Sequence, residues 1–353
     1  IGALNYLASQ QVNSIYFLPM NIGGDGKSVY PYLGPIDANG SPDNDNLHFD
    51  LAKLHQWEIV FEHAQRKGIM LHFVLNEAEP ANKQELDNGQ LGTERKLFYR
   101  ELISRFGHFP ALQWNLSEEY NLHHKIEPRT IKEFAQYIAD VDPYDHPITV
   151  HHASRAERAW APFVGDPLFT VTSFQENEDV SELVETWRTK SRKAGVPLVI
   201  GMDEFFPDKT SPTNIERHRK EYIWNVYFSG GQTEIILDDL LRVEDFRKYE
   251  SVWQYMAHAR NFMNQHLPFW EMQPEDDLLK GESEFKGENN VVTGQVLAKD
   301  GEVYAIYLPS ASKTGELDLR ESSATYRLRW FNPRTGKVEG PKVQASGGQF
   351  VPL

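Results

Sequence analysis

The chain has 353 residues, 40% of them hydrophobic and 12% aromatic, a composition typical of a packed globular protein rather than a disordered one. Its 51 acidic and 36 basic residues give a net charge of −15, which disfavours nucleic acid and anionic membranes as partners because both attract basic surfaces. Cysteine is absent, so disulfides, thiolate metal sites and a cysteine nucleophile are excluded.

Strand-like and helix-like segments alternate from residue 1 to about residue 265. The expected strands are short apolar runs that end in polar or glycine-rich loops, and they cover residues 14–20, 69–75, 111–114, 147–150, 169–174, 197–202 and 233–237. The expected helices carry apolar residues at helical spacing and cover residues 1–11, 51–67, 93–106, 131–139, 180–193, 215–228 and 243–265. Repeated βα units of this kind predict a parallel sheet.

The strand count favours an α/β fold of the (β/α)₈ TIM-barrel type, whose first strand would lie upstream of Ile1. A doubly wound open sheet is the alternative, but no Gly-x-Gly-x-x-Gly turn opens a helix. Short alternating segments separated by turn residues follow residue 270, and they predict a small all-β sandwich. We therefore expect a barrel domain over residues 1–270 and a sandwich domain over residues 271–353. No apolar run approaches the roughly 18 residues of a membrane-spanning helix.

Paired acidic residues follow two of the expected strands. Glu118 and Glu119 come after the strand at 111–114, and Asp203 and Glu204 come after the strand at 197–202. Catalytic groups of barrels lie at the carboxyl ends of strands, and two carboxylates from different βα units are what glycoside hydrolysis requires. Because successive strand side chains point to opposite sides, we expect one acid of each pair to face the barrel axis and Asp203 to cap or pair elsewhere.

Other polar strand ends are expected to line the same mouth, with Tyr120 among the aromatic side chains that could stack on a sugar. These predicted substrate-binding residues are Asn21, Asn76, His151 and Gln175. Glu77 and Glu79 are expected to be loop charges. The sequence predicts neither a metal site nor a cofactor, because it contains no His-Glu-x-x-His helix, and no Gly-x-Ser-x-Gly turn marks a serine hydrolase.

The stretch Trp114-Asn115-Leu116-Ser117-Glu118-Glu119-Tyr120 resembles the strand-four Trp-x-x-Gly-Asn-Glu motif of clan A glycoside hydrolases, the group around family 5. The resemblance extends to bacterial family-5-like proteins that end in a β-sandwich classed as a collagen-binding domain. Their shared stretches are similar to residues 16–26, 57–61, 98–106 and 267–272. This resemblance implies a carbohydrate substrate and a secreted, periplasmic or cell-surface location, and it leaves a cytoplasmic location open.

By this resemblance Glu119 takes the acid/base position and Glu204 the nucleophile position of a retaining glycoside hydrolase. Glu118 stands where those enzymes usually carry an asparagine whose amide contacts the sugar 2-hydroxyl, so it is expected to contact the substrate. The departure leaves two alternatives open. Glu118 could be the acid and Glu119 structural, or catalysis could be lost, which would leave a carbohydrate-binding or adhesion protein.

Overall fold

The computed structural model describes residues 1–24, 28–35, 43–153, 155–176, 178–205, 212–237, 245–288 and 290–353. The chain divides into two compact units. The first comprises the described parts of Ile1–Glu176, Arg188–Phe206 and Glu234–Phe246, and the second those of Asn177–Trp187, Pro207–Thr233 and Arg247–Leu353. The predicted division between residues 270 and 271 stays a prediction.

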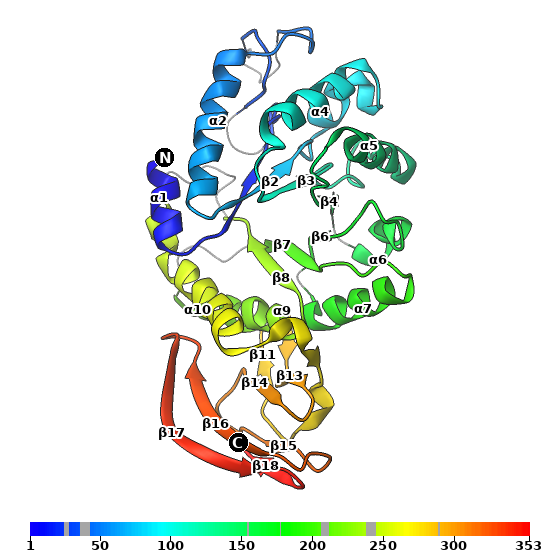
Figure 1. Cartoon of the computed structure of the whole chain (residues 1–353). Coiled ribbons are helices and arrows are strands. Elements are labelled where there is room, and N and C mark those ends of the chain that lie inside the picture. Colours follow the sequence, from blue (N-terminus) through cyan, green and yellow to red (C-terminus); the bar gives the residue numbers. More distant parts are fainter. Residues whose placement is uncertain are drawn as a thin grey trace. The chain divides into compact units, whose positions relative to one another are not determined.

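The barrel strands form two parallel sheets (Figure 1). Four strands pair in chain order in the first sheet: β1 (Ser14–Phe17), β2 (Met70–Val74), β3 (Leu112–Asn115) and β4 (Ile148–Thr149). The second sheet contains β5 (His151–His152), β6 (Ser173–Phe174), β7 (Gly201–Phe205) and β8 (Gln232–Ile235). β4 and β5 are separated only by Val150, so one stretch of chain passes from the first sheet to the second. The predicted α/β barrel is thus confirmed, and the strand expected upstream of Ile1 stays a prediction.

The strands of the second sheet differ most from the expected ranges. β6 begins at Ser173, and the preceding Val171 makes only an isolated bridge to Val199. The Thr172 hydroxyl accepts the N–H of Gly201 at 2.9 Å, where a backbone carbonyl would accept it in a continuous strand. β7 therefore begins only at Gly201, and it includes Asp203 and Glu204 instead of ending before them.

Helices precede and follow the strands of the first sheet: α1 (Gly2–Ser9), α2 (Leu51–Arg66), α3 (Pro80–Glu85), α4 (Thr93–Phe106) and α5 (Pro128–Val141). The short α6 (Ala156–Ala159) follows β5 of the second sheet. The Asp50 carboxylate starts α2 by accepting the N–H of Lys53 at 3.0 Å. Gly68 follows the end of α2 with a φ of +74°, which side chains rarely allow. In Figure 1, α2, α4 and α5 lie outside the strands.

An aromatic cluster joins these helices to the sheet. Trp114 of β3 is fully buried, and its ring centroid lies 5.2 Å from that of Phe73 in β2. Phe73 in turn contacts Phe61 of α2 at 5.1 Å and Phe106 of α4 at 5.7 Å. Since side chains alternate along a strand, Trp114 on the helix side places Asn115 on the inner side of the sheet.

The helices that follow β6 are α7 (Val180–Lys193), α8 (Pro212–His218), α9 (Trp224–Phe228) and α10 (Glu250–His266). The helix expected over 215–228 is interrupted between α8 and α9 by a π-helical turn, Arg219–Ile223. This turn contains the buried Glu221, whose carboxylate accepts the N–H of Glu288 at 2.7 Å. A side chain at Gly287 would collide with the same carboxylate, because its Cβ would lie 2.0 Å from Glu221 Oε1.

Small antiparallel sheets make up the C-terminal part. One sheet orders β14 (Val303–Tyr307), β13 (Gln295–Lys299) and β9 (Gln273–Pro274), and another orders β10 (Leu279–Lys280), β15 (Glu316–Asp318) and β18 (Phe350–Pro352). β11 (Phe285–Lys286) pairs with β12 (Val291–Val292), and β16 (Thr325–Asn332) with β17 (Lys337–Ser346). Val296 of β13, Leu317 of β15 and Val351 of β18 share one core.

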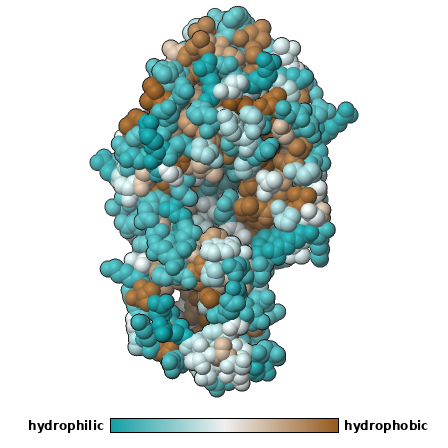
Figure 2. All heavy atoms as spheres, viewed as in Figure 1, coloured by the Kyte–Doolittle hydropathy of each residue, from teal (hydrophilic) through white to brown (hydrophobic). Residues whose placement is uncertain are grey.

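The surface agrees with the composition. The face in Figure 2 is mainly hydrophilic, with scattered hydrophobic patches. Among the helices of the described residues, none combines the length and the apolar character that a membrane span needs.

Candidate active site

Two carboxylates from different strand ends meet beside a histidine. A carboxylate oxygen of Glu118, a carboxylate oxygen of Glu204 and a ring nitrogen of His151 lie within 4.8 Å of one another, and all three residues are buried. The Nε2 atom of His151 is 3.0 Å from Glu204 Oε2, and the Gln175 amide donates to Glu204 Oε1 at 2.6 Å. The structure therefore brings together four of the residues expected at the mouth: Glu118, His151, Gln175 and Glu204.

The tautomer of His151 follows from its backbone partner. The N–H of Glu119 donates to His151 Nδ1 at 3.1 Å, so this nitrogen acts as an acceptor. The ring proton then lies on Nε2, which faces Glu204. His151 thus connects the turn after β3 to the carboxylate of β7.

The environment of Glu118 favours its neutral form. Burial raises the pKa of Glu118 well above its ordinary value, and the charges of Glu77 and Glu204 act in the same direction. A carboxyl group that keeps its proton towards neutral pH is what a general acid requires.

Glu119 lies outside this group of neighbouring side-chain atoms. It is half-buried in the turn after β3, with a φ of +37° that is uncommon for a residue with a side chain. The ammonium of Lys83 fixes this turn by donating to the carbonyls of Glu119 at 2.7 Å and of Leu122 at 2.6 Å. Lys83 is itself buried, and burial lowers its pKa to about 8.

Asn76 holds the backbone next to Glu118 through hydrogen bonds. Its side-chain oxygen accepts from Arg95 Nη1 at 2.8 Å, and its amide nitrogen donates to the Leu116 carbonyl at 2.9 Å. Its backbone carbonyl accepts the N–H of Glu118 at 2.8 Å. These bonds hold the backbone on both sides of Ser117, so Asn76 contributes to the position of Glu118.

Tyr120 and Asn21 have local partners away from the cluster. Tyr120 is buried, donates its hydroxyl to the Ala159 carbonyl at 2.6 Å, and packs edge-on against Phe163. Asn21 pairs with Val29 through both backbone groups at 2.7 Å. Contact of either side chain with a substrate stays a prediction.

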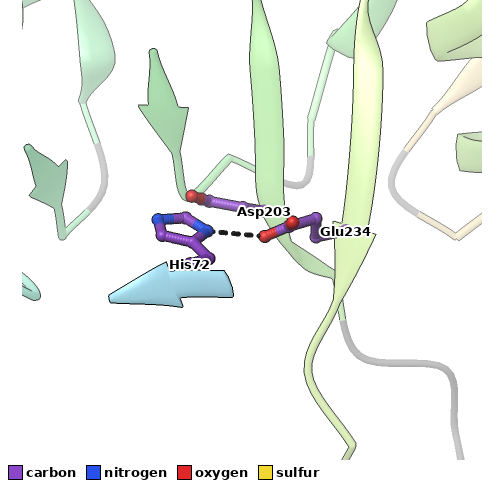
Figure 3. A group of neighbouring side chains, drawn as sticks. All are labelled: His72, Asp203 and Glu234. Carbon is purple, nitrogen blue, oxygen red and sulfur yellow. Dashed lines mark hydrogen bonds and ion pairs between the residues drawn. The ribbon is translucent and has the colours of Figure 1, made fainter. Parts of the chain in front are cut away.

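A second group of titratable side chains lies in the barrel interior: His72 of β2, Asp203 of β7 and Glu234 of β8 (Figure 3). His72 Nδ1 is 2.8 Å from Glu234 Oε2, and the Ser173 hydroxyl donates to Asp203. Burial raises the pKa of Asp203 to about 6. The expectation that Asp203 would point away is wrong, because its Oδ1 lies 3.8 Å from the same His151 Nε2 that contacts Glu204.

Asn115 connects the two groups. Its Oδ1 accepts the backbone N–H of His151 at 3.1 Å, which fixes the orientation of the amide. Its Nδ2 then donates to His72 Nε2 at 3.1 Å and to Ser173 Oγ at 3.0 Å. The side chains of His72, Asp203 and Glu234 offer nitrogen and oxygen atoms of the type that coordinates zinc. However, both ring nitrogens of His72 are already engaged, so a metal ion would have to displace the bond to Glu234.

Sequence reasoning missed most of this interior network. His72 and Asn115 are polar residues within apolar strands, and in a sheet that is covered on one face by helices such residues face the barrel axis. That signal was available in the sequence. Glu77 lies in a loop as expected, but it is buried, and its Oε2 accepts from Asn82 Nδ2 at 3.2 Å and from the N–H of Glu79 at 3.1 Å.

Comparisons with known proteins agree with the barrel. No family model and no curated protein matches the sequence. A glycoside hydrolase family 5 structure from Bacteroides vulgatus is similar with a TM-score of 0.75 at 14% identity, over 100% of this chain and 81% of that one. An endo-1,4-β-mannanase from Rhizomucor miehei has a TM-score of 0.52 at 14% identity, over 74% of this chain and 90% of that one. An endo-β-1,4-mannanase from Thermotoga petrophila has a TM-score of 0.52 at 13% identity, over 98% and 92%. The chain thus has the α/β-barrel fold of glycoside hydrolase family 5 structures, as its motifs suggested.

Proposed function

We propose that this protein is a glycoside hydrolase that cleaves an O-glycosidic bond of an oligo- or polysaccharide with retention of configuration. The observation that carries the proposal is the approach of Glu118 and Glu204 to within 4.8 Å through one oxygen each. Retaining enzymes hold their two carboxyl groups about 5–5.5 Å apart, whereas inverting enzymes leave about 6.5–9.5 Å for a water molecule. The fold, shared with glycoside hydrolase structures, supports the same class of reaction.

Glu204 is the proposed nucleophile. Gln175 donates to one of its oxygens at 2.6 Å, and His151 Nε2 lies 3.0 Å from the other, so both oxygens are oriented by neighbours. In the first step Glu204 attacks the anomeric carbon while an acid protonates the departing oxygen. In the second step the same acid, now a base, takes a proton from the water that releases the sugar.

The acid/base role has two candidates. The motif resemblance assigns it to Glu119, and the geometry favours Glu118, because Glu118 lies beside Glu204 and burial raises its pKa. We therefore propose Glu118 as the acid/base residue and Glu119 as the alternative.

The test compares Glu118→Gln, Glu119→Gln and Glu204→Gln on aryl glycosides and polysaccharides. The panel includes β-1,4-mannan, because two proteins that share the fold are endo-β-1,4-mannanases. We expect E204Q and the variant of the true acid to lose at least about 100-fold in kcat/KM, and the other variant to lose much less. Of E118Q and E119Q, azide should restore turnover of an activated aryl glycoside only in the variant of the true acid. Polysaccharide binding by the wild type without any hydrolysis would instead support a carbohydrate-binding or adhesion protein.

A further inference from the structure

A chain of hydrogen bonds crosses the barrel interior from β8 to β5. Its first bond joins Glu234 Oε2 of β8 to His72 Nδ1 of β2 at 2.8 Å (Figure 3). Asn115 of β3 continues the chain, because its Nδ2 donates to His72 Nε2 at 3.1 Å and its Oδ1 accepts the backbone N–H of His151 at 3.1 Å. The chain therefore ends at the residue whose imidazole lies 3.0 Å from Glu204 Oε2.

Side chains join two strands that backbone pairing leaves apart. Among the described residues, β1 and β8 belong to different backbone-paired sheets. The carboxylate of Glu234 accepts the Ser14 hydroxyl of β1 through one oxygen and contacts His72 of β2 through the other. Glu234 thus ties β8 to the first sheet, and the place of His72 depends on this carboxylate.

The direction of each bond is defined. The Asn115 amide cannot be reversed, because its oxygen accepts a backbone N–H, so its nitrogen faces His72 Nε2. His72 Nε2 is then an acceptor, and the ring proton lies on Nδ1, towards the carboxylate. The same Asn115 nitrogen donates to Ser173 Oγ at 3.0 Å, and the Ser173 hydroxyl donates to Asp203. A displacement of His72 would therefore move the amide and, with it, the backbone of His151.

Close packing protects these bonds from water. Asn115 and Ser173 are fully buried and His72 nearly so. Tyr16 packs edge-on against the His72 ring with centroids 4.8 Å apart, and the amide of Gln113 donates to His72 Nε2 at 3.1 Å. Buried hydrogen bonds that water cannot replace hold side chains in one arrangement.

We propose that Asn115 and His72 are positioning residues that fix His151 and, through it, the orientation of Glu204. The inference rests on the proposed function for its role in turnover. A displaced His151 backbone would change the approach of Nε2 to Glu204 Oε2, and an error of about 1 Å in the place of a catalytic group can cost about 100-fold in rate. The effect should fall on kcat rather than on KM, because both residues act through His151.

Two substitutions of His72 separate the two ends of the chain. The amide of His72→Asn can still donate to Glu234 from near the place of Nδ1, but it leaves Asn115 Nδ2 without its acceptor. The amide oxygen of His72→Gln can accept from Asn115 near the place of Nε2, but the donor to Glu234 is lost. We expect H72N and Asn115→Ala to lower kcat by at least about tenfold with little change in KM, and H72Q to retain kcat within about threefold.

Gln113→Leu is the matched control. It removes a bond to the same His72 nitrogen, but that bond does not pass through Asn115. Q113L should lower the temperature of unfolding and leave kcat within about twofold.

NMR spectra of the ring nitrogens of His151 give a readout that needs no turnover. The His151 signals are assigned by their loss in His151→Gln. H72N and N115A should shift these signals, whereas H72Q and Q113L should leave them in place.

The outcomes separate this inference from the proposed function. Unchanged kcat and unchanged His151 signals in H72N overturn the positioning role even if E204Q abolishes hydrolysis. Losses of kcat that are equal in H72N and H72Q and follow their losses of stability also overturn it, because the bonds would then serve only the fold. Shifted His151 signals in a protein that hydrolyses no glycoside keep the positioning role and overturn the enzymatic assignment. If N115A does not fold, the comparison of H72N with H72Q decides.

Discussion

His151 links the two strand ends of the site, because its Nε2 lies 3.0 Å from Glu204 Oε2 while its Nδ1 accepts the N–H of Glu119 at 3.1 Å. One side chain thereby orients both the proposed nucleophile and the turn that follows β3. Among the described residues of β5, His151 alone contacts both Glu204 and the backbone of Glu119 through its side chain.

Replacement of His151 should therefore reduce the chemical step more than substrate binding. We expect His151→Ala to lower kcat by about 100-fold with a small change in KM, because the preorganised imidazole beside Glu204 Oε2 is lost. His151→Gln, which can still place an N–H near Glu204, should retain part of the activity. His123→Ala, in the exposed loop after the motif, is the control. Steady-state kinetics of the three variants decide the matter, and full activity of H151A would contradict the role.

Lys83 should make the free energy of unfolding vary with pH in the alkaline range. Burial lowers its pKa to about 8, below the ordinary value of about 10.4 that it regains in the unfolded chain. Between these values the unfolded chain binds one more proton than the folded one, so the free energy of unfolding rises with pH from about 8 to about 10. Lys83→Met should remove this slope in urea unfolding experiments, whereas Lys125→Met, at an exposed position, should preserve it. Parallel pH profiles of K83M and the wild type would refute the assignment.

The sequence predicted the fold well where local pattern and tertiary packing agree. The apolar strand that ends at Trp114 is present because its outer face packs on Phe73, as the periodicity implied. β7 was misplaced because the side chain of Thr172, rather than the backbone, bonds to Gly201. When a side-chain oxygen accepts a hydrogen bond in place of a backbone carbonyl, the sequence shows no periodic pattern that would predict it.

The candidate site was predictable in its residue types but not in its pairings. Strand-end placement identified Glu118, His151 and Glu204, which the structure brings together. Glu77 and Glu118 are both buried at neighbouring strand ends, although they lie about forty residues apart in the sequence, and no local pattern predicts this proximity. The same holds for His72 and Glu234, whose contact depends on opposite parts of the chain meeting in the barrel interior.

A buried ion pair under β3 should contribute most of its stabilisation at mildly acidic pH. Asp142 accepts from His146 Nδ1 at 2.8 Å and from Trp114 Nε1 at 2.9 Å, while His146 Nε2 donates to the Phe109 carbonyl at 3.0 Å. Although burial opposes both charges, these bonds lower the pKa of Asp142 and raise that of His146. The contribution of Asp142 is lost as pH falls below its ordinary pKa of about 3.9, and that of His146 as pH rises above about 6.5.

Asp142→Asn should accordingly cost about 3 kcal/mol of unfolding free energy near pH 6. The loss should be smaller at pH 9, because His146 gives up its proton as the pH rises. Urea unfolding at the two pH values tests this, with Asp140→Asn on the exposed side of α5 as the control. An equal loss at both values would show that the charge of His146 does not matter.

Aromatic contacts within the second unit cross the predicted boundary at residue 270. Trp224 of α9 stacks on Tyr307 of β14, with ring centroids 5.8 Å apart and planes 13° from parallel, and Phe262 of α10 lies 4.7 Å from Phe331 of β16. A fragment of residues 1–270 would lack Tyr307 and Phe331 and would expose Trp224 and Phe262 to water. We therefore expect this fragment to aggregate.

In the full chain, Tyr307→Ala should cost about 3–5 kcal/mol, because it leaves a cavity beside a buried tryptophan. Tyr304→Ala, at a less buried position of the same strand, should cost less and serves as the control. Light scattering and thermal unfolding measure both expectations. A monomeric 1–270 fragment with the thermal stability of the full chain would show that the barrel and the C-terminal sheets fold independently.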